Sequence, residues 1–308
     1  MNKIFCYGWN NCLGVSNGTI ELVVTLDVGP RIIRFGFAGG TNLFRVYPEM
    51  MGKTGGREWR IYGGHRLWVA PELPSLTYFP DNRPVAARGL PGGVRIVAPP
   101  ERPSGIAKTM DIRLHSRRAA VTVTHRIRNA GRRTLTIAPW GLSVLREDTR
   151  VVFPLPTRAR AGRRTPLPTG VFGLWDYTDF LDDRWMFGRR FVILRQVRGR
   201  RTSQKIGSFV PDGWAAAAGR DFLLVKRFPV SAGRAYPDGG CNFETYTDGN
   251  MIEIETLGPL VNLAPGQSVA HAERWFLFPG VPALRSDRDV EKYVMPRVRE
   301  TGGRSLGV

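Results

Sequence analysis

The chain has 308 residues, of which 45 are Lys or Arg and 26 are Asp or Glu, so its formal net charge is +19. Hydrophobic residues make up 42% of the chain, which is typical of a globular protein and excludes a disordered one. Three cysteines without a C-x-x-C spacing argue against a disulfide framework and a structural zinc site. No run reaches the ~18 apolar residues of a membrane helix, and residues 1–13 hold no apolar stretch of signal-peptide length. We therefore expect a cytoplasmic protein without membrane contact.

The positive charge favours acidic partners, which include nucleic acid, anionic glycans and phosphorylated sugars. Arginine supplies nearly all of it, since only six of the 45 basic residues are lysine. An arginine excess of this size is also typical of GC-rich genomes, and in that case the charge carries no function. Both interpretations stay open.

Residues of alternating polarity predict strands joined by turns that contain Gly, Pro or Asn. The first two strands are expected at residues 20–26 and 31–37, with a Gly-Pro turn between them. Further strands are expected at residues 110–114, 120–128, 134–137, 191–196, 207–210, 222–228, 251–255 and 273–278.

Two other segments depart from the strand pattern. Residues 154–168, rich in Arg, Pro and Gly, predict a long exposed loop, because so many charges are not buried unpaired. Ser286 and the acidic residues after it predict the start of a short helix that closes a sheet edge, and Pro296 should end or kink that helix.

No break in composition divides the chain, so a single domain over residues 1–308 is expected. Many short strands with turn signals favour an all-β fold in which two large antiparallel sheets pack face to face. One inner face would fill the core, and a concave outer face would be free to hold a ligand.

The densest polar and aromatic cluster is residues 62–72, which include His65, Arg66 and Trp68. A flat indole suits the C–H face of a sugar, and a guanidinium suits hydroxyls or carboxylates. Gly63 and Gly64 would let the backbone approach a ligand closely. The alternative is a structural histidine on a loop beside a core tryptophan.

A second cluster follows the turn at residues 248–250. In the strand after it, Ile252 and Ile254 point to one face, while Glu253 and Glu255 point to the other. Two like charges on one face raise a carboxyl pKa if they lie in a cleft, which suits a general base. The alternative is a solvated outer face.

The remaining candidates for chemistry are weaker. Acidic and aromatic residues alternate between Trp175 and Trp185, and could bind calcium or sugar hydroxyls, but their spacing differs from that of an EF-hand loop. The chain has no Walker A loop, no G-x-G-x-x-G, no H-E-x-x-H and no G-x-S-x-G. Phosphoryl transfer, nicotinamide chemistry and serine hydrolysis therefore have no support, and we expect neither a cofactor nor a metal ion.

At these clusters the sequence resembles the galactose mutarotase-like superfamily, which includes the aldose 1-epimerases. The closest similarity is to an uncharacterised family with a G-G-H-R-L-W-x-A-P-E signature, which stands here at residues 63–72. Other shared patterns are G-P-R-I-I at residues 29–33, N-L-F at 42–44, E-T at 255–256 and L-A-P-G at 263–266.

The resemblance implies a β-supersandwich with a short C-terminal helix and a sugar in its concave face. In the family a glutamate takes the proton of the anomeric hydroxyl and a histidine protonates the ring oxygen. By position, Glu255 is the base and His65 the first histidine. Trp140 stands where the second histidine is expected, and an indole cannot act as that acid. His65 would have to take over, or Lys205 or Lys226 would supply a positive group.

Arg66, Trp68, Trp140, Lys205 and Glu253 are expected to bind a mono- or oligosaccharide, either neutral or anionic. Four functions stay open: an enzyme acting at the anomeric centre, a non-catalytic carbohydrate-binding or sensing module, a lyase or hydrolase of anionic glycans, and nucleic-acid binding. The last is least favoured, since no RNP, KH or helix-turn-helix pattern occurs.

Overall fold

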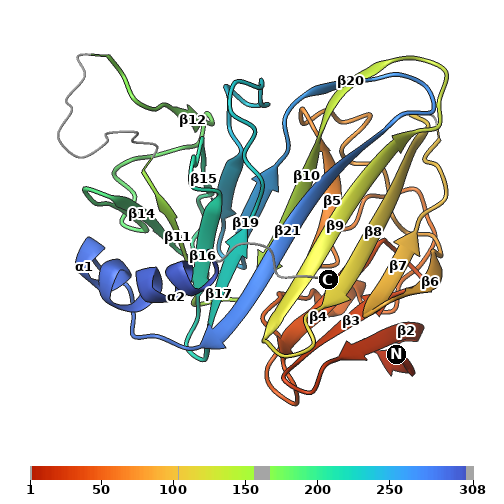
Figure 1. Cartoon of the computed structure of the whole chain (residues 1–308), viewed down its shortest axis with the longest axis horizontal. Helices are drawn as coiled ribbons and strands as arrows, with labels where there is room; N and C mark the ends of the chain where they lie inside the picture. Colours follow the sequence, from red (N-terminus) through yellow and green to blue (C-terminus); the bar gives the residue numbers. More distant parts are fainter. Residues whose placement is uncertain (1, 103, 156–166, 303–308) are drawn as a thin grey trace.

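The computed structural model describes residues 2–102, 104–155 and 167–302, and its two large antiparallel sheets pack face to face (Figure 1). The predicted fold class, all-β with two large sheets and one short C-terminal helix, is confirmed. Within the described ranges, no helix has the length and apolar character needed to cross a membrane.

The first sheet carries the candidate site and has a long, continuous order. Its strands are, in spatial order, β1 (Asn2–Cys6), β2 (Trp9–Ser16), β3 (Ile20–Thr25), β4 (Arg31–Phe37), β5 (Gly64–Ala70), β10 (Leu135–Leu145), β19 (Ile252–Leu257), β18 (Phe243–Thr247), β15 (Gln204–Ser208) and β12 (Phe172–Leu174), with β20 (Val261–Leu263) paired to the start of β10. A short 3-10 helix, η1 (Pro48–Met50), lies between β4 and β5.

The second sheet covers the inner face of the first. Its strands are, in spatial order, β13 (Trp185–Phe187), β14 (Phe191–Arg195), β11 (Arg150–Pro154), β16 (Trp214–Ala218), β17 (Phe222–Arg227), β21 (Ser268–Pro279), β9 (Ala120–Asn129), β8 (Ile106–Leu114), β7 (Gly93–Val97) and β6 (Ala86–Leu90). Each strand predicted from the sequence overlaps one of these or one of the first sheet.

Alternation along the strands sorts residues between the core and the outer face. On β19, Ile252 and Ile254 pack in the core between the sheets, and Glu253 and Glu255 line a cavity on the outer face. Since the outer face of β5, β10 and β19 is also covered, by residues such as Trp59, these strands are buried on both sides.

Pro139 lies inside β10, a central strand, where proline is normally excluded because it has no N–H to donate. On one edge β10 pairs with β5 through this point, but on its other edge the partner changes. Leu135–Ile137 pair with β20, and Trp140–Leu145 pair with β19, so Pro139 falls in the break between the two ladders. The proline therefore removes no hydrogen bond from either ladder.

The C-terminal helix begins where the sequence predicted. The Ser286 side chain accepts a hydrogen bond from the Asp289 N–H at the start of α1 (Asp287–Asp289). The helix does not end at Pro296. Instead it widens to the π-helical segment η2 (Val290–Val294) just before the proline and continues as α2 (Met295–Glu300).

The helix covers a sheet face and not the sheet edge that was expected. Val290, Val294 and Val298 pack on the outer face of the second sheet, where Ala216 and Ala218 of β16 are small enough to let a helix approach. Figure 1 shows α1 and α2 running alongside this sheet. The loop predicted at residues 154–168 begins as β11 ends at Pro154, but residues 156–166 lie outside the described part of the chain.

Candidate functional site

A cavity of about 780 Å³ opens on the outer face of the first sheet. Strands β5, β10, β15 and β19 form its floor, and aromatic side chains including Trp59, Tyr78 and Trp175 form its walls. Six of the seven site residues predicted from the sequence line it: Arg66, Trp68, Trp140, Lys205, Glu253 and Glu255.

Glu255 is fully buried at the floor of this cavity. The Trp140 indole N–H donates to its Oε2 over 2.9 Å, and the Lys205 Nζ lies 3.6 Å from the same oxygen. Its other oxygen, Oε1, has no hydrogen-bond partner in the described part of the chain. Burial raises the pKa of Glu255 above its ordinary value, and Lys205 and the Trp140 hydrogen bond oppose that rise only in part. These two contacts favour the carboxylate form and leave one oxygen available to a ligand.

Lys205 is held between two indole rings, with its Nζ 4.8 Å from the centre of Trp140 and 4.4 Å from that of Trp175. The Nζ also lies 2.8 Å from Glu244 Oε2. Burial by itself lowers the pKa of Lys205, but attraction by Glu255 and Glu244 outweighs it, and the net pKa is well above the ordinary value. Lys205 is therefore a permanent ammonium group that orients both rings.

Glu253 lies two residues from Glu255 on the same face and is also buried. Burial, followed by repulsion from Glu255, raises the pKa of Glu253 to about 8. Its nearest cation is Arg66, whose Nη2 is 3.9 Å from Oε1, and that oxygen has no hydrogen-bond partner among the described residues. Glu253 is therefore protonated near neutral pH.

Arg66 is stacked against the cavity wall. Its guanidinium carbon lies 4.2 Å from the ring centre of Trp68 and 5.1 Å from that of Trp59, and its Nη1 donates to the Ile61 carbonyl. Burial lowers the pKa of Arg66 to about 10, so the group stays charged at neutral pH. These contacts fix the indole of Trp68 as one flat surface of the cavity.

The sequence analysis missed Glu244, which pairs directly with Glu255 across the β18–β19 ladder. Glu244 is fully buried, and burial raises its pKa well above the ordinary value, with Lys205 opposing the shift. The three buried carboxyl groups, Glu244, Glu253 and Glu255, thus have only two cations beside them, Arg66 and Lys205. Their pKa values are all raised, so they hold protons to a higher pH than exposed carboxyl groups do.

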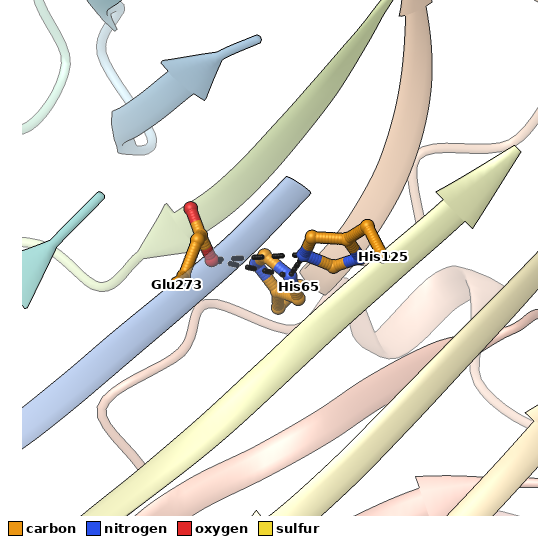
Figure 2. A group of neighbouring side chains, drawn as sticks. All are labelled: His65, His125 and Glu273. Atoms are coloured by element: carbon orange, nitrogen blue, oxygen red, sulfur yellow. Dashed lines mark hydrogen bonds and ion pairs between the residues drawn. The ribbon is translucent and has the colours of Figure 1, made fainter. Parts of the chain in front are cut away.

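His65, the seventh predicted residue, lies on the opposite face of the same sheet. Its Nδ1 shares a hydrogen bond of 2.8 Å with the Ser143 hydroxyl. Its Nε2 lies 2.9 Å from His125 Nε2, between the two sheets (Figure 2). Neighbouring residues of a strand point to opposite faces. Since Arg66 faces the cavity, His65 must face away from it. The expected pairing of His65 with Glu255 across one sugar is therefore not what the structure has.

The group around His65 is a buried polar network between the sheets. Glu273 Oε2 lies 3.6 Å from His65 Nε2 (Figure 2). The same oxygen accepts from the Trp275 indole N–H, while Oε1 accepts from the Thr256 hydroxyl. Lys226 Nζ lies 3.1 Å from Glu273 Oε1, so this lysine also faces away from the cavity. Burial lowers the pKa of His65 well below its ordinary value, so the imidazole is neutral.

His65, His125 and Glu273 are the one group within the described ranges whose ligand atoms lie close enough to hold a metal, all within 4.8 Å of one another. Both oxygens of Glu273 already accept hydrogen bonds, and the Lys226 ammonium supplies the balancing charge. A divalent cation would add two charges beside a buried ammonium, which is costly. The arrangement favours a hydrogen-bonded network over a metal centre.

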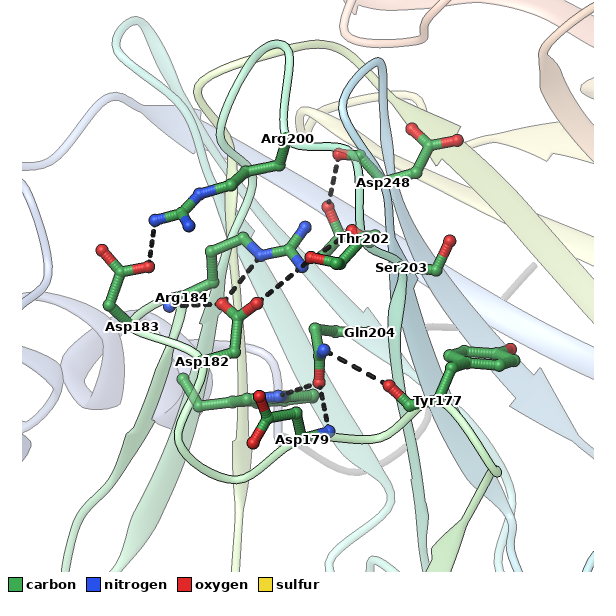
Figure 3. A network of polar contacts seen from close by, with 12 residues as sticks. Tyr177, Asp179, Asp182, Asp183, Arg184, Arg200, Thr202, Ser203, Gln204 and Asp248 are labelled. Carbon is green, nitrogen blue, oxygen red and sulfur yellow. Dashed lines mark hydrogen bonds and ion pairs between the residues drawn. The ribbon is translucent and has the colours of Figure 1, made fainter.

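The acidic run between Trp175 and Trp185 is held in a network of polar contacts beside the cavity (Figure 3). Asp182 binds the buried Arg184, and Asp183 binds Arg200, so these carboxylates are not free for calcium. Gln204 accepts from the Asp179 N–H and donates to the Tyr177 carbonyl, which ties the wall to the strand that carries Lys205. What the segment presents to the cavity is Trp175 and Tyr177.

Gly63 and Gly64 have positive φ angles of 97° and 74°. A Cβ at Gly63 would come within 2.0 Å of the Arg45 carbonyl oxygen, and one at Gly64 within 2.3 Å of the Ile32 carbonyl oxygen. The close approach predicted for these glycines is therefore to neighbouring backbone and not to a ligand.

No family model matches this chain, and no curated protein matches its sequence. Solved structures do share its fold. A galactose mutarotase-like protein of Lactobacillus casei is 10% identical, with a TM-score of 0.56 over 87% of this chain and 100% of that one. A galactose mutarotase-related enzyme of Lactobacillus acidophilus is 11% identical, with a TM-score of 0.56 over 89% and 99%. A provisional aldose 1-epimerase of Escherichia coli K12 is 14% identical, with a TM-score of 0.52 over 87% and 99%. The fold is thus that of galactose mutarotase-like proteins.

Proposed function

We propose that this protein binds a sugar in the cavity of the first sheet and catalyses exchange between its α and β anomers, with Glu255 as the base. The observation that carries the proposal is the setting of Glu255. It is buried, Trp140 and Lys205 contact one of its oxygens and favour its carboxylate form, and its other oxygen has no partner among the described residues in an aromatic-lined cavity. The galactose mutarotase-like fold supports a carbohydrate ligand.

The reaction needs one base and one acid at the anomeric centre. Glu255 would take the proton of the anomeric hydroxyl, while an acid gives a proton to the ring oxygen, and the ring C–O bond breaks to leave the open-chain aldehyde. Rotation about the neighbouring C–C bond, followed by the reverse proton transfers, closes the ring as the other anomer.

Glu253 is the acid in this proposal. It is protonated near neutral pH, its Oε1 has no protein partner among the described residues, and it faces the same cavity. Residues i and i+2 of a strand have Cα atoms roughly 7 Å apart, which is about the width of a sugar ring. Two carboxyl groups with pKa values pushed apart are the usual basis for separate acid and base roles.

A non-catalytic sugar-binding module is the second candidate. The observation that favours it is that none of the four histidines lines the cavity, so the imidazole used in the related reaction is missing from it.

Saturation-transfer NMR on a panel of neutral, acidic and phosphorylated sugars separates these candidates. We expect faster anomer exchange of at least one sugar with the wild type, no acceleration with Glu255→Gln, and unchanged acceleration with Glu49→Gln, an exposed glutamate. Sugar binding without faster exchange would instead support the binding module. Neither binding nor exchange with any sugar would contradict both candidates.

A further inference from the structure

A second cavity, of about 870 Å³, lies beside the sugar cavity. Three loops form it: the turn before β4 at Gly29 and Pro30, residues 79–83 after β5, and residues 98–102 between β7 and β8. Residues 56–57 close one side. The proposed sugar chemistry uses none of these residues.

The charges of this second cavity are unbalanced. Its two acidic residues are each paired with a buried cation, Asp81 with Arg31 over 2.7 Å and Glu101 with Lys108 over 2.7 Å. Three exposed arginines also line it, Arg57, Arg83 and Arg102. None of these three forms an ion pair with any residue that the structure describes. The lining therefore carries three uncompensated guanidinium groups, whose planar fork of N–H donors suits two oxygens of a carboxylate or a sulfate.

The same cavity also holds an unused acceptor. The Oδ1 of Asp81 is buried and has no hydrogen-bond partner in the described ranges, and an oxygen in that state is stabilised by a ligand hydroxyl. Free guanidinium groups beside a free carboxylate oxygen match a ligand that carries both anionic groups and hydroxyls.

We propose that the second cavity binds an anionic saccharide, one that carries carboxylate or sulfate groups. Nucleic acid fits less well. Phe79 is the sole aromatic residue found among the described lining residues, whereas proteins that bind single strands use several aromatic rings as stacking surfaces. This site is independent of the proposed anomer exchange in the first cavity.

Neighbouring segments of the chain line the two cavities. Trp59 and Tyr78 line the first cavity, while their near neighbours Arg57 and Phe79 line the second. The Ile61 carbonyl oxygen accepts from Arg31 Nη1 over 2.9 Å and from Arg66 Nη1 over 3.1 Å, and so joins the arginine behind Asp81 to the arginine beside Glu253.

The test measures binding of a heparin-derived hexasaccharide by isothermal titration calorimetry. The first variant carries Arg57→Gln, Arg83→Gln and Arg102→Gln. The matched control carries Arg189→Gln, Arg288→Gln and Arg299→Gln, three exposed arginines at the end of the second sheet and on the C-terminal helix, so that both variants lose the same charge. Maltohexaose, a neutral sugar of the same length, measures how much of the binding does not depend on the anionic groups.

We expect the first triple variant to weaken hexasaccharide binding by about tenfold or more, and the control variant to weaken it little. Equal weakening in both variants would mean that the general positive field is responsible, which would overturn the proposal. No binding by the wild type would overturn it too. Tighter binding of an oligonucleotide, lost in the same first variant, would replace the saccharide by nucleic acid.

Discussion

Glu253 and Glu255 stand two residues apart on β19 and face one cavity, yet their surroundings differ. Glu255 has an indole donor and an ammonium beside it, whereas Glu253 has only a guanidinium at 3.9 Å. A buried carboxyl without such partners keeps its proton. The acid and base roles proposed for Glu253 and Glu255 thus rest on two neighbouring side chains, Trp140 and Lys205.

This difference predicts how stability depends on pH. The pKa of Glu253 is raised from 4.5 to about 8 in the folded protein. A carboxyl whose folded pKa is raised contributes its full stability below the unfolded pKa, and that contribution is lost as the pH rises through the folded pKa. The wild type should therefore lose stability between about pH 4.5 and pH 8, and Glu253→Gln should lose less over this window.

Urea denaturation at about pH 5, 7 and 9 measures the effect. Glu49→Gln, which changes an exposed glutamate, should parallel the wild type. A stability difference between wild type and Glu253→Gln that stays constant with pH would show that Glu253 is already ionised, and would remove it as the acid.

Lys205 provides a second prediction at this scale. Lys205→Met keeps most of the side chain between the Trp140 and Trp175 rings but removes the charge shared by Glu244 and Glu255. Leaving buried carboxylates without their cation costs about 3–5 kcal/mol of unfolding free energy. Thermal or urea denaturation against Lys53→Met, at an exposed position, measures it. A loss no greater than in that control would contradict the structure of the site.

At the scale of elements, β5, β10 and β19 each have functional contacts on both faces. Their outer residues line the first cavity, while inner residues such as His65, Ser143 and Thr256 bind the network around Glu273. The network on the second sheet thus holds the strands that carry the site. Its contacts with the backbone are direct, since Lys226 Nζ lies 3.4 Å from the Ile254 carbonyl oxygen on β19.

Gly141 on β10 tests this arrangement. A Cβ there would lie 3.0 Å from Glu273 Oε1 and 3.2 Å from His125 Nε2, both of them fixed in the network. Gly141→Ala should therefore lower the free energy of unfolding by about 1–3 kcal/mol. Gly14→Ala on β2 is the control, because its Cβ would meet the end of the Ile4 side chain at 3.3 Å, which can move. Equal effects of the two substitutions would mean that the network tolerates the added methyl group.

Local pattern predicted part of this arrangement and missed the rest. Alternation placed Glu253 and Glu255 on one face of β19, as the structure has them. The same rule places His65 and Arg66 on opposite faces of β5. The sequence analysis nevertheless assigned both residues to one site, because the whole G-H-R-L-W segment resembles the sugar site of the family. Glu244 and the second cavity could not be predicted, because each depends on pairing between segments far apart in the chain, such as β18 with β19.

At the scale of the whole molecule, charge is distributed unevenly. The protein carries +19. The first cavity nevertheless has more acidic than basic lining residues, namely Glu72, Asp238, Glu253 and Glu255 against Arg66 and Lys205. The second cavity has the opposite balance, with Arg57, Arg83 and Arg102 uncompensated. The positive surface therefore says little about the ligand of the first cavity.

This division predicts different responses to salt. Binding of the heparin hexasaccharide should weaken steeply between about 50 and 200 mM salt, because screening acts on exposed charges. Anomer exchange of a neutral sugar in the first cavity should change little over the same range, since its charges are buried. Exchange rates and calorimetry at both salt concentrations give the comparison. A steep fall in both would mean that one electrostatic field governs both cavities.

The alternation of β19 also limits how this protein can change over evolution. A strand has a period of two residues, so deleting one residue ahead of Glu253 would exchange its faces. Glu253 and Glu255 would then point into the core, against residues such as Leu224 and Ile206. Ile252 and Ile254 would replace them at the floor of the cavity. Substitutions can reshape this site one side chain at a time, whereas an insertion or deletion inside the strand would remove it in a single step.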